Sequence, residues 1–213
     1  MKINLILLAS GFSRRFNGNK LFAQLNNKPL YMNIAHKVIE MNSNSERSEV
    51  SFNKIICVTQ YEEIEKGLKD TEIHVIRNYN SDLGISNSIK LGINYDMGAD
   101  GYMFMVCDQP FIKKETILRI INTFSKGAKG IVGAGTKDMA DEERRYVIGN
   151  PVIFSRKYIN ELLALEGDKG GKKVVMNHLD DVEIVQIQDA VELVDIDTKE
   201  AYEILKNNFK ELL

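Results

Sequence analysis

The sequence predicts an α/β fold in which helices cover both faces of one mostly parallel β-sheet. Apolar runs of strand length alternate with segments of helical periodicity along most of the chain. The runs are apolar at successive positions, which is typical of strands buried on both faces of a parallel sheet. No repeat or low-complexity tract interrupts the pattern. The alternation therefore indicates βαβ units.

The individual elements follow from these runs. Strands are expected at 3–8, 54–59, 72–77, 101–106, 130–134, 152–154, 182–187 and, as a short piece, 193–196. Helices are expected at 29–40, where Pro29 opens the first turn, and at 61–69, 85–95, 114–124 and 198–212. The polar stretches 42–53 and 136–145 are expected to be loops. We expect a single domain over 1–213.

Composition excludes several classes of protein. The chain has 213 residues, a formal net charge of -2 and 44% apolar residues, which argues against nonspecific binding to nucleic acid or to an anionic membrane. It has no apolar run of the roughly 18 residues that a membrane span needs, and its first residues do not form a secretory signal. Cys57 and Cys107 are expected to be buried free thiols, and His36, His74 and His178 lack zinc-site spacing. A soluble cytoplasmic protein is expected.

The loop after the first strand predicts a nucleotide site. It reads Leu8-Ala9-Ser10-Gly11-Phe12-Ser13-Arg14-Arg15, with Lys20 following. Small residues let backbone N–H groups approach an anion or a base edge, and arginine and lysine supply positive charge for phosphate. Neither Gly-x-x-x-x-Gly-Lys-Ser/Thr nor Gly-x-Gly-x-x-Gly is present. The alternative is a surface loop with solvated cations.

Two carboxylates are candidates for binding a metal ion beside that loop. Asp108 directly follows the strand at 101–106, and Mg²⁺ is commonly held by one or two carboxylates together with phosphate oxygens. A turn or a helix cap is the alternative role for Asp108. Asp197 lies just before the last helix, so helix capping competes with metal binding there. In the predicted strand, Asp195 and Asp197 share one face and Ile196 has the other, which leaves Asp195 open as a second candidate.

Six ordered motifs resemble the molybdenum cofactor nucleotidyltransferases, the MobA-like family, and most closely their cytidylyltransferase branch. They are the segments 8–15 with Lys20, 84–88, 107–110, 149–154, 167–171 and 195–198. The resemblance implies a Rossmann-like sheet of the nucleotide-diphospho-sugar transferase type. It also implies transfer of a nucleotide from CTP or GTP to a molybdopterin-type acceptor, with Mg²⁺ as cofactor and release of pyrophosphate. A molybdoenzyme is the implied client.

The same resemblance implies roles for individual residues. Nucleotide binding falls to Leu8, Ala9, Ser10, Gly11, Gly84, Ser86 and Ser88, together with Arg15 and Lys20 on the triphosphate. Arg15, Lys20 and Asp108 are the expected catalytic residues, and Asp108 and Asp197 the expected metal ligands. Asn150 and Asp168 are expected to face the acceptor. Nucleotide binding is thereby assigned to about 1–110 and the acceptor to about 111–213.

The resemblance favours CTP over GTP, because the guanylyl branch opens with Gly-Gly where this chain has Ala9-Ser10-Gly11, and because Gln109 precedes Pro110. The chain departs from the family pattern at Ser10, where alanine is usual, and at Asn17, where glycine is usual. Asparagine tolerates the left-handed conformation, so the turn can survive. Transfer to a sugar or polyol phosphate and a nucleotide-binding accessory protein without turnover are the remaining alternatives.

Overall fold

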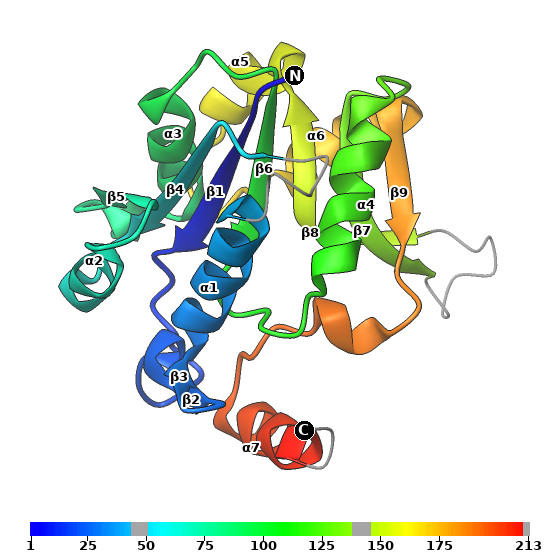
Figure 1. Ribbon diagram of the computed structural model, residues 1–213. Coiled ribbons are helices and arrows are strands. Elements are labelled where there is room, and N and C mark those ends of the chain that lie inside the picture. The colour runs from blue at the N-terminus through cyan, green and yellow to red at the C-terminus, as the bar shows by residue number, and fades with distance from the viewer. Residues whose placement is uncertain (44–50, 138–145, 211–213) are drawn as a thin grey trace.

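The computed structural model describes residues 1–43, 51–137 and 146–210, and a seven-stranded sheet lies at its centre (Figure 1). The order of the strands is β5-β4-β1-β6-β8-β7-β9. Among the described strands of this sheet, β8 alone is antiparallel to its neighbours. The strands are β1 (Ile3–Ala9), β4 (Lys54–Thr59), β5 (His74–Arg77), β6 (Gly101–Val106), β7 (Ile131–Lys137), β8 (Tyr146–Ser155) and β9 (Val182–Gln186). The expected mostly parallel sheet is confirmed.

Helices cover both faces of this sheet (Figure 1). One face carries α1 (Leu30–Ser43), α2 (Glu62–Leu68) and α4 (Lys114–Ser125). The other carries α3 (Ile85–Tyr95), α5 (Ile159–Leu163) and α6 (Lys172–Asn177). The short α5 and α6 and the hairpin of β2 (Gln24–Leu25) and β3 (Lys28–Pro29) were not expected from the sequence.

Strand β1 shows why the sheet needs both layers. Leu5 and Leu7 pack with α1 and α4, whereas Ile6 packs with α3 on the opposite face. All three side chains have no exposed surface. Burying a leucine or isoleucine contributes about 1.5–3 kcal/mol, so a strand of this composition is stable only between two layers of helices.

The antiparallel strand corrects two expectations. Thr136 and Lys137, expected in a loop, end β7, and the rest of that loop, 138–145, lies outside the described residues. Strand β8 begins at Tyr146 rather than at Val152, so Gly149, Asn150 and Pro151 lie within it. The pairing of β7 with β8 shifts register between Gly133 and Gly135, and such a bulge accommodates residues that fit a regular strand poorly.

The expected strand at 193–196 is wrong. A 3-10 helix, Ala190–Leu193, comes first, and residues 194–197 then cross the carboxyl edge of the sheet without joining it. The backbone N–H of Ile196 donates to the carbonyl of Asp108 at 3.0 Å. The alternation of burial survives nevertheless, because Ile196 is fully buried between the exposed Asp195 and the half-buried Asp197.

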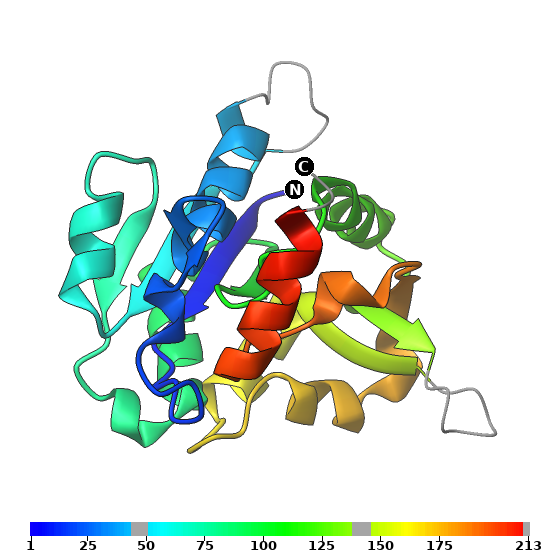
Figure 2. The ribbon, with the colours of Figure 1, turned by 90° about the horizontal axis from the view of Figure 1, so that it is seen from below.

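A third apolar cluster joins the two ends of the chain below the sheet. Phe16, from the loop after β1, packs edge-to-face on Tyr202 of α7 (Lys199–Lys210), with ring centroids 5.8 Å apart. The Tyr202 hydroxyl donates to the carbonyl of Gln24 at 2.6 Å. Figure 2 shows α7 lying across the carboxyl edge of the sheet beside the β2–β3 hairpin. Contacts between residues so far apart in the sequence hold this helix over the loop.

No helix in the described part of the chain is long and apolar enough to span a membrane. Cys57 and Cys107 are buried free thiols, as expected.

Candidate active site

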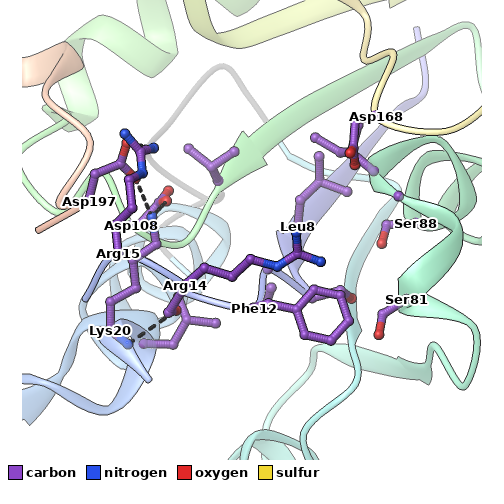
Figure 3. Close-up of a pocket in the computed structure, with 18 of the residues that line it drawn as sticks. Leu8, Phe12, Arg14, Arg15, Lys20, Ser81, Ser88, Asp108, Asp168 and Asp197 are labelled. Carbon is purple, nitrogen blue, oxygen red and sulfur yellow. Dashed lines mark hydrogen bonds and ion pairs between the residues drawn. The ribbon is translucent and has the colours of Figure 1, made fainter. Parts of the chain in front are cut away.

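A pocket of about 410 Å³ lies at the carboxyl ends of β1 and β6 (Figure 3). The backbone N–H of Cys107 donates to the carbonyl of Leu8 at 3.3 Å, which keeps the two strand ends side by side. The chain passes from β5 at one edge of the sheet to β6 on the far side of β1, so the connections diverge on the two sides of β1. Open α/β sheets bind their ligands at such a switch point.

The lining of the pocket includes most of the residues that the sequence indicated. They are Leu8, Ala9, Ser10, Gly11, Arg15, Lys20, Gly84, Ser88, Asp108, Asp168 and Asp197. Lining residues not singled out as site residues are Phe12, Ser13, Arg14, Leu21, Ser81, Asp82, Ile85 and Val106. Most of these residues flank the chosen motifs. The motifs therefore identified the segments that form the pocket wall, but not every side chain in it.

The loop after β1 has its shape from a few backbone positions. Asn17 has a φ of 52°, so it takes the left-handed conformation expected where the family has glycine. Lys20 begins a 3-10 helix, Lys20–Phe22, whose N-cap Asn19 accepts a hydrogen bond from the N–H of Leu21 at 3.1 Å. The N–H of Lys20 donates to the Ser13 hydroxyl at 3.2 Å. The backbone at Lys20 is therefore fixed although its side chain is long.

The segment after β4 holds the small-residue part of the loop. The carbonyl of Ser10 accepts from the Gln60 amide at 2.7 Å, and that of Gly11 accepts from the Tyr61 hydroxyl at 2.6 Å. The hydroxyl of Ser10 donates to the carbonyl of Val58 at 3.1 Å. The hydroxyl by which Ser10 departs from the family pattern is thus paired with the neighbouring strand.

Four charged side chains gather at one end of the pocket (Figure 3). Lys20 Nζ lies 2.5 Å from Asp108 Oδ2 and 2.7 Å from Asp197 Oδ1. Arg15 Nη2 lies 2.6 Å from Asp197 Oδ2. The Lys20 side chain is only 11% exposed, whereas that of Arg15 is 72% exposed. Lys20 is therefore the cation more strongly held by this cluster.

Lys20, Asp197 and the neighbouring Asp195 have shifted pKa values. Burial alone lowers the pKa of Lys20, but the charges of Asp108 and then Asp197 raise it above its usual value. The hydrogen bond from Lys20 is the main cause that lowers the pKa of Asp197. Asp195 is exposed overall, yet desolvation of its carboxylate and then the negative charge of Asp108 raise its pKa to about 6. All three carboxylates therefore belong to one electrostatic unit.

The donor set at this end of the pocket fits a divalent cation. Asp108 Oδ1 is buried and accepts no hydrogen bond from any described residue. Asp108 and Asp197 both contact Lys20 Nζ, so their oxygens lie no further apart than the sum of those two short distances. The described residues contain no cluster of three or more metal-ligating side chains, but Mg²⁺ is commonly held by one or two carboxylates with phosphate and water completing its shell.

Helix capping, the alternative role for Asp197 and Asp108, does not explain the positions of these two carboxylates. The Thr198 hydroxyl accepts from the N–H of Ala201 at 3.2 Å at the start of α7, which leaves the Asp197 carboxylate to Lys20 and Arg15. Helix α4 begins six residues after Asp108, too far for Asp108 to cap it. These contacts favour Asp197 over Asp195 as the partner of Asp108.

The opposite end of the pocket joins α3 to the loop before α6. The N–H of Ser86 donates to the carbonyl of Gly167 at 3.2 Å, and Ser86 itself is buried behind the wall. The Ser88 hydroxyl lines the pocket and accepts from the Asn78 amide at 3.0 Å. Asp168 also lines this end, whereas Asn150 lies in β8 and is not among the lining residues.

Lys37 of α1 is a residue near the site that the sequence did not indicate. Its ammonium group donates to the carbonyls of Pro110, at 2.9 Å, and Ile112, in the loop that follows Asp108. Burial, followed by the positive charge of Lys114, lowers the pKa of Lys37 to about 8, against the opposing effect of Glu192, Glu115 and Glu40. A lysine on a helix is ordinarily exposed, so sequence alone carried no signal for this contact.

This pKa predicts a pH-dependent stability. Between about pH 8 and pH 10.5 the unfolded chain keeps a proton on Lys37 that the folded protein has lost, so wild type should gain stability relative to Lys37→Met as the pH rises. The gain is at most about 1.4 kcal/mol per pH unit. Urea unfolding of both proteins at pH 7.5, 8.5 and 9.5 measures it, and Lys173→Met, at an exposed position, controls for the loss of one lysine. A difference that stays flat or falls would contradict the assignment.

Comparison with known proteins gives the fold from solved structures and the family from the sequence. Solved structures of nucleotidyltransferases share the fold: a nucleotidyl transferase from Methanothermobacter, Mth528, aligns over 100% of this chain and 99% of its own, with 22% identity and a TM-score of 0.77. The family follows from sequence. The family model of the MobA-like NTP transferase domain matches residues 5–182, so the chain belongs to the MobA-like nucleotidyltransferases. None of the curated proteins matches the sequence.

Solved structures of two further proteins show the range of this fold. Rv0371c of Mycobacterium tuberculosis H37Rv is 23% identical, with a TM-score of 0.75 and coverage of 97% of this chain and 99% of its own. A second structure of Rv0371c is a complex with manganese. CMP:2-keto-3-deoxy-manno-octonic acid synthetase, in complex with CTP, is 11% identical, with a TM-score of 0.76 and full coverage of both chains. Identities this low establish the shared fold only.

Proposed function

We propose that this protein transfers a cytidylyl group from CTP to a molybdopterin-type acceptor, with Mg²⁺ as cofactor, and releases pyrophosphate. The observation that carries the proposal is the pocket, whose wall combines the loop after β1 with Gly84, Asp108, Asp168 and Asp197. The segments expected to bind nucleotide and metal thus share the pocket with Asp168, one of the two residues expected to face the acceptor, whereas Asn150 does not line it. This arrangement also supports the division of one domain into a nucleotide-binding half, about 1–110, and an acceptor-facing half, about 111–213.

The proposed reaction needs no nucleophilic side chain from the protein. A phosphate oxygen of the acceptor forms a bond to the α-phosphorus, and the bond from that phosphorus to the bridging oxygen of pyrophosphate breaks. The protein positions the two reactants and stabilises the developing charge. Arg15 and Lys20 neutralise the departing pyrophosphate, while the backbone of Ala9 to Gly11 lies against the base. Asp168, a carboxylate, suits N–H donors on the acceptor better than its phosphate.

Asp108 and Asp197 would hold the Mg²⁺ ion. When bound, the ion supplies positive charge to the phosphate oxygens. The rigidity of the site supports this role for Asp108, because it follows a buried strand and its carbonyl is hydrogen bonded to Ile196. A protein that only binds nucleotide has no need of such a carboxylate pair, which weighs against the accessory role.

The choice of CTP depends mainly on the loop after β1. Gln109, the other residue that favoured CTP, is buried, donates to the carbonyl of Leu193 at 3.2 Å and is not part of the pocket lining. It influences the base only by fixing the segment that leads to Asp197. The CTP complex of the synthetase described above supports cytidylyl transfer on this fold. The same comparison keeps transfer to a sugar or polyol phosphate as the alternative, with GTP as the alternative donor.

We expect CTP to be the best donor, by about tenfold or more in kcat/KM over GTP, UTP and ATP. Pyrophosphate release with each nucleotide, with and without a molybdopterin-type acceptor and with a set of sugar and polyol phosphates, measures this. Faster guanylyl transfer would overturn the choice of CTP, and turnover with sugar phosphates alone would overturn the acceptor.

Lys20→Ala should lower kcat/KM by about tenfold to a hundredfold with every donor, since a charge-assisted contact is lost.

The proposed reaction makes a molybdoenzyme the client of the product, and the cytoplasm the compartment where both meet.

A further inference from the structure

One ammonium group occupies the centre of the carboxylate cluster. Lys20 Nζ contacts both Asp108 Oδ2, at 2.5 Å, and Asp197 Oδ1, at 2.7 Å. The second oxygen of Asp197 is taken by Arg15. Three of the four carboxylate oxygens are therefore paired with protein cations, and Asp108 Oδ1 is the one without a partner among the described residues.

Two carboxylates this close need a cation between them, because like charges in a partly buried site repel strongly. Lys20 meets that need, with a side chain that is even more buried than that of Asp108. A divalent cation on the same two carboxylates would lie near the ammonium group and be repelled by it. The two cations therefore cannot both make full use of Asp108 and Asp197.

Lys20 is also able to leave. Its backbone is fixed by the 3-10 helix and by Ser13, but four methylene groups separate that backbone from the charge. The pocket that Lys20 lines is the one proposed to hold the triphosphate, whose oxygens offer the ammonium group an alternative set of anions. Arg14 differs from Lys20: it lines the same pocket but contacts the ring of Phe12, with its guanidinium carbon 5.5 Å from the ring centroid.

We propose that Lys20 competes with the divalent cation for Asp108 and Asp197, so that metal binds well only after the triphosphate has drawn Lys20 away. The proposal rests on the proposed function for the identity of the triphosphate site. Nucleotide and metal then bind cooperatively, each increasing the affinity for the other, and Lys20 carries part of that coupling. The protein discriminates against free metal and favours metal that arrives with a nucleotide.

The test measures the binding of Mn²⁺ alone, without nucleotide, by electron paramagnetic resonance of the unbound ion. Lys20→Met should bind Mn²⁺ at least tenfold more tightly than wild type, whereas Lys20→Arg, which keeps the charge, should stay near wild type. Arg14→Met removes one positive charge from the same pocket without freeing a carboxylate, and its smaller effect sets the purely electrostatic baseline. Adding Asp108→Asn to Lys20→Met should abolish the gain.

Equal effects of Lys20→Met and Arg14→Met, or no gain in Lys20→Met, would overturn the competition. Thermal unfolding checks the fold: Mn²⁺ should raise the Tm of Lys20→Met more than that of wild type. If Lys20→Met does not fold, Lys20→Gln, which keeps a hydrogen-bond donor, serves in its place with the same expected direction. If the wild-type protein releases pyrophosphate from CTP normally but Lys20→Met shows no gain in Mn²⁺ affinity, only the competition is overturned. If Lys20→Met gains Mn²⁺ affinity but the wild-type protein has no transferase activity, only the proposed function is overturned.

Discussion

Asp108→Asn should reduce nucleotidyl transfer by about a hundredfold to a thousandfold and leave the protein folded. The substitution keeps the size of the side chain and removes the charge on which Lys20 and the proposed metal ion depend. Its position at the end of the buried strand β6 does not depend on that charge, so the loss of stability should be about 1 kcal/mol. Turnover as a function of Mg²⁺ concentration, measured alongside thermal unfolding, separates the two effects.

The matched control is Asp70→Asn, which removes a carboxylate from an exposed turn after α2. It should change neither turnover nor its dependence on Mg²⁺. If Asp108→Asn retained nearly wild-type turnover and lost mainly stability, Asp108 would be a turn residue and the metal site would have to be sought elsewhere.

Gly84→Ala should destabilise the protein by about 3 kcal/mol and distort the pocket. Gly84 has a φ of +86° and a ψ of -178°, a combination that is essentially restricted to glycine. A Cβ atom there would lie 2.4 Å from the backbone carbon and oxygen of Gly167 and 2.7 Å from an Asp168 oxygen. Because the obstacle is backbone, relief requires α3 and the 167 loop to separate. Urea unfolding and the KM for nucleotide measure both effects.

Gly127→Ala isolates the conformational part of this loss. Gly127 also has a positive φ, of +70°, but a Cβ atom there would meet nothing within 4 Å. Its cost should be about 1 kcal/mol, with no effect on the KM for nucleotide. Equal losses for the two variants would mean that α3 and the 167 loop adapt to the extra carbon, and that their close approach contributes nothing to the pocket.

Sequence reasoning succeeded where local composition decides the structure. Strands β4 and β6 and helix α3 were predicted to the residue, because the strands are short apolar runs and the helix has a clear helical periodicity. The left-handed Asn17 was predicted from the known tolerance of asparagine. These features depend on neighbours along the chain, which a sequence displays directly.

It failed where a distant partner decides. Gly149, Asn150 and Pro151 have poor strand propensity, yet the pairing of Ile148 and Val152 with β7 on either side of them keeps them within β8. Residues 193–196 have the alternation of a strand, but they do not join a sheet edge. Their contact is with the loop after β6, where the N–H of Ile196 donates to the carbonyl of Asp108. The roles of Lys37 and Tyr202 depend on contacts with the loop after Asp108 and with Phe16 and Gln24, which no local pattern encodes.

The cluster of Phe16 with Ile196 and Tyr202 has a consequence for synthesis of the protein. The loop after β1 is made long before Ile196 and Tyr202, which complete the apolar cluster that Leu25 and Leu30 begin around Phe16. Contacts of such large sequence separation form late, because the intervening chain must first be ordered. Once β9 has been made, the nascent chain can therefore complete its sheet while Ile196 and Tyr202 are still missing from the apolar support of the loop. The end of the pocket that combines Lys20 with Asp197 is assembled only after the seven strands of the sheet have been made.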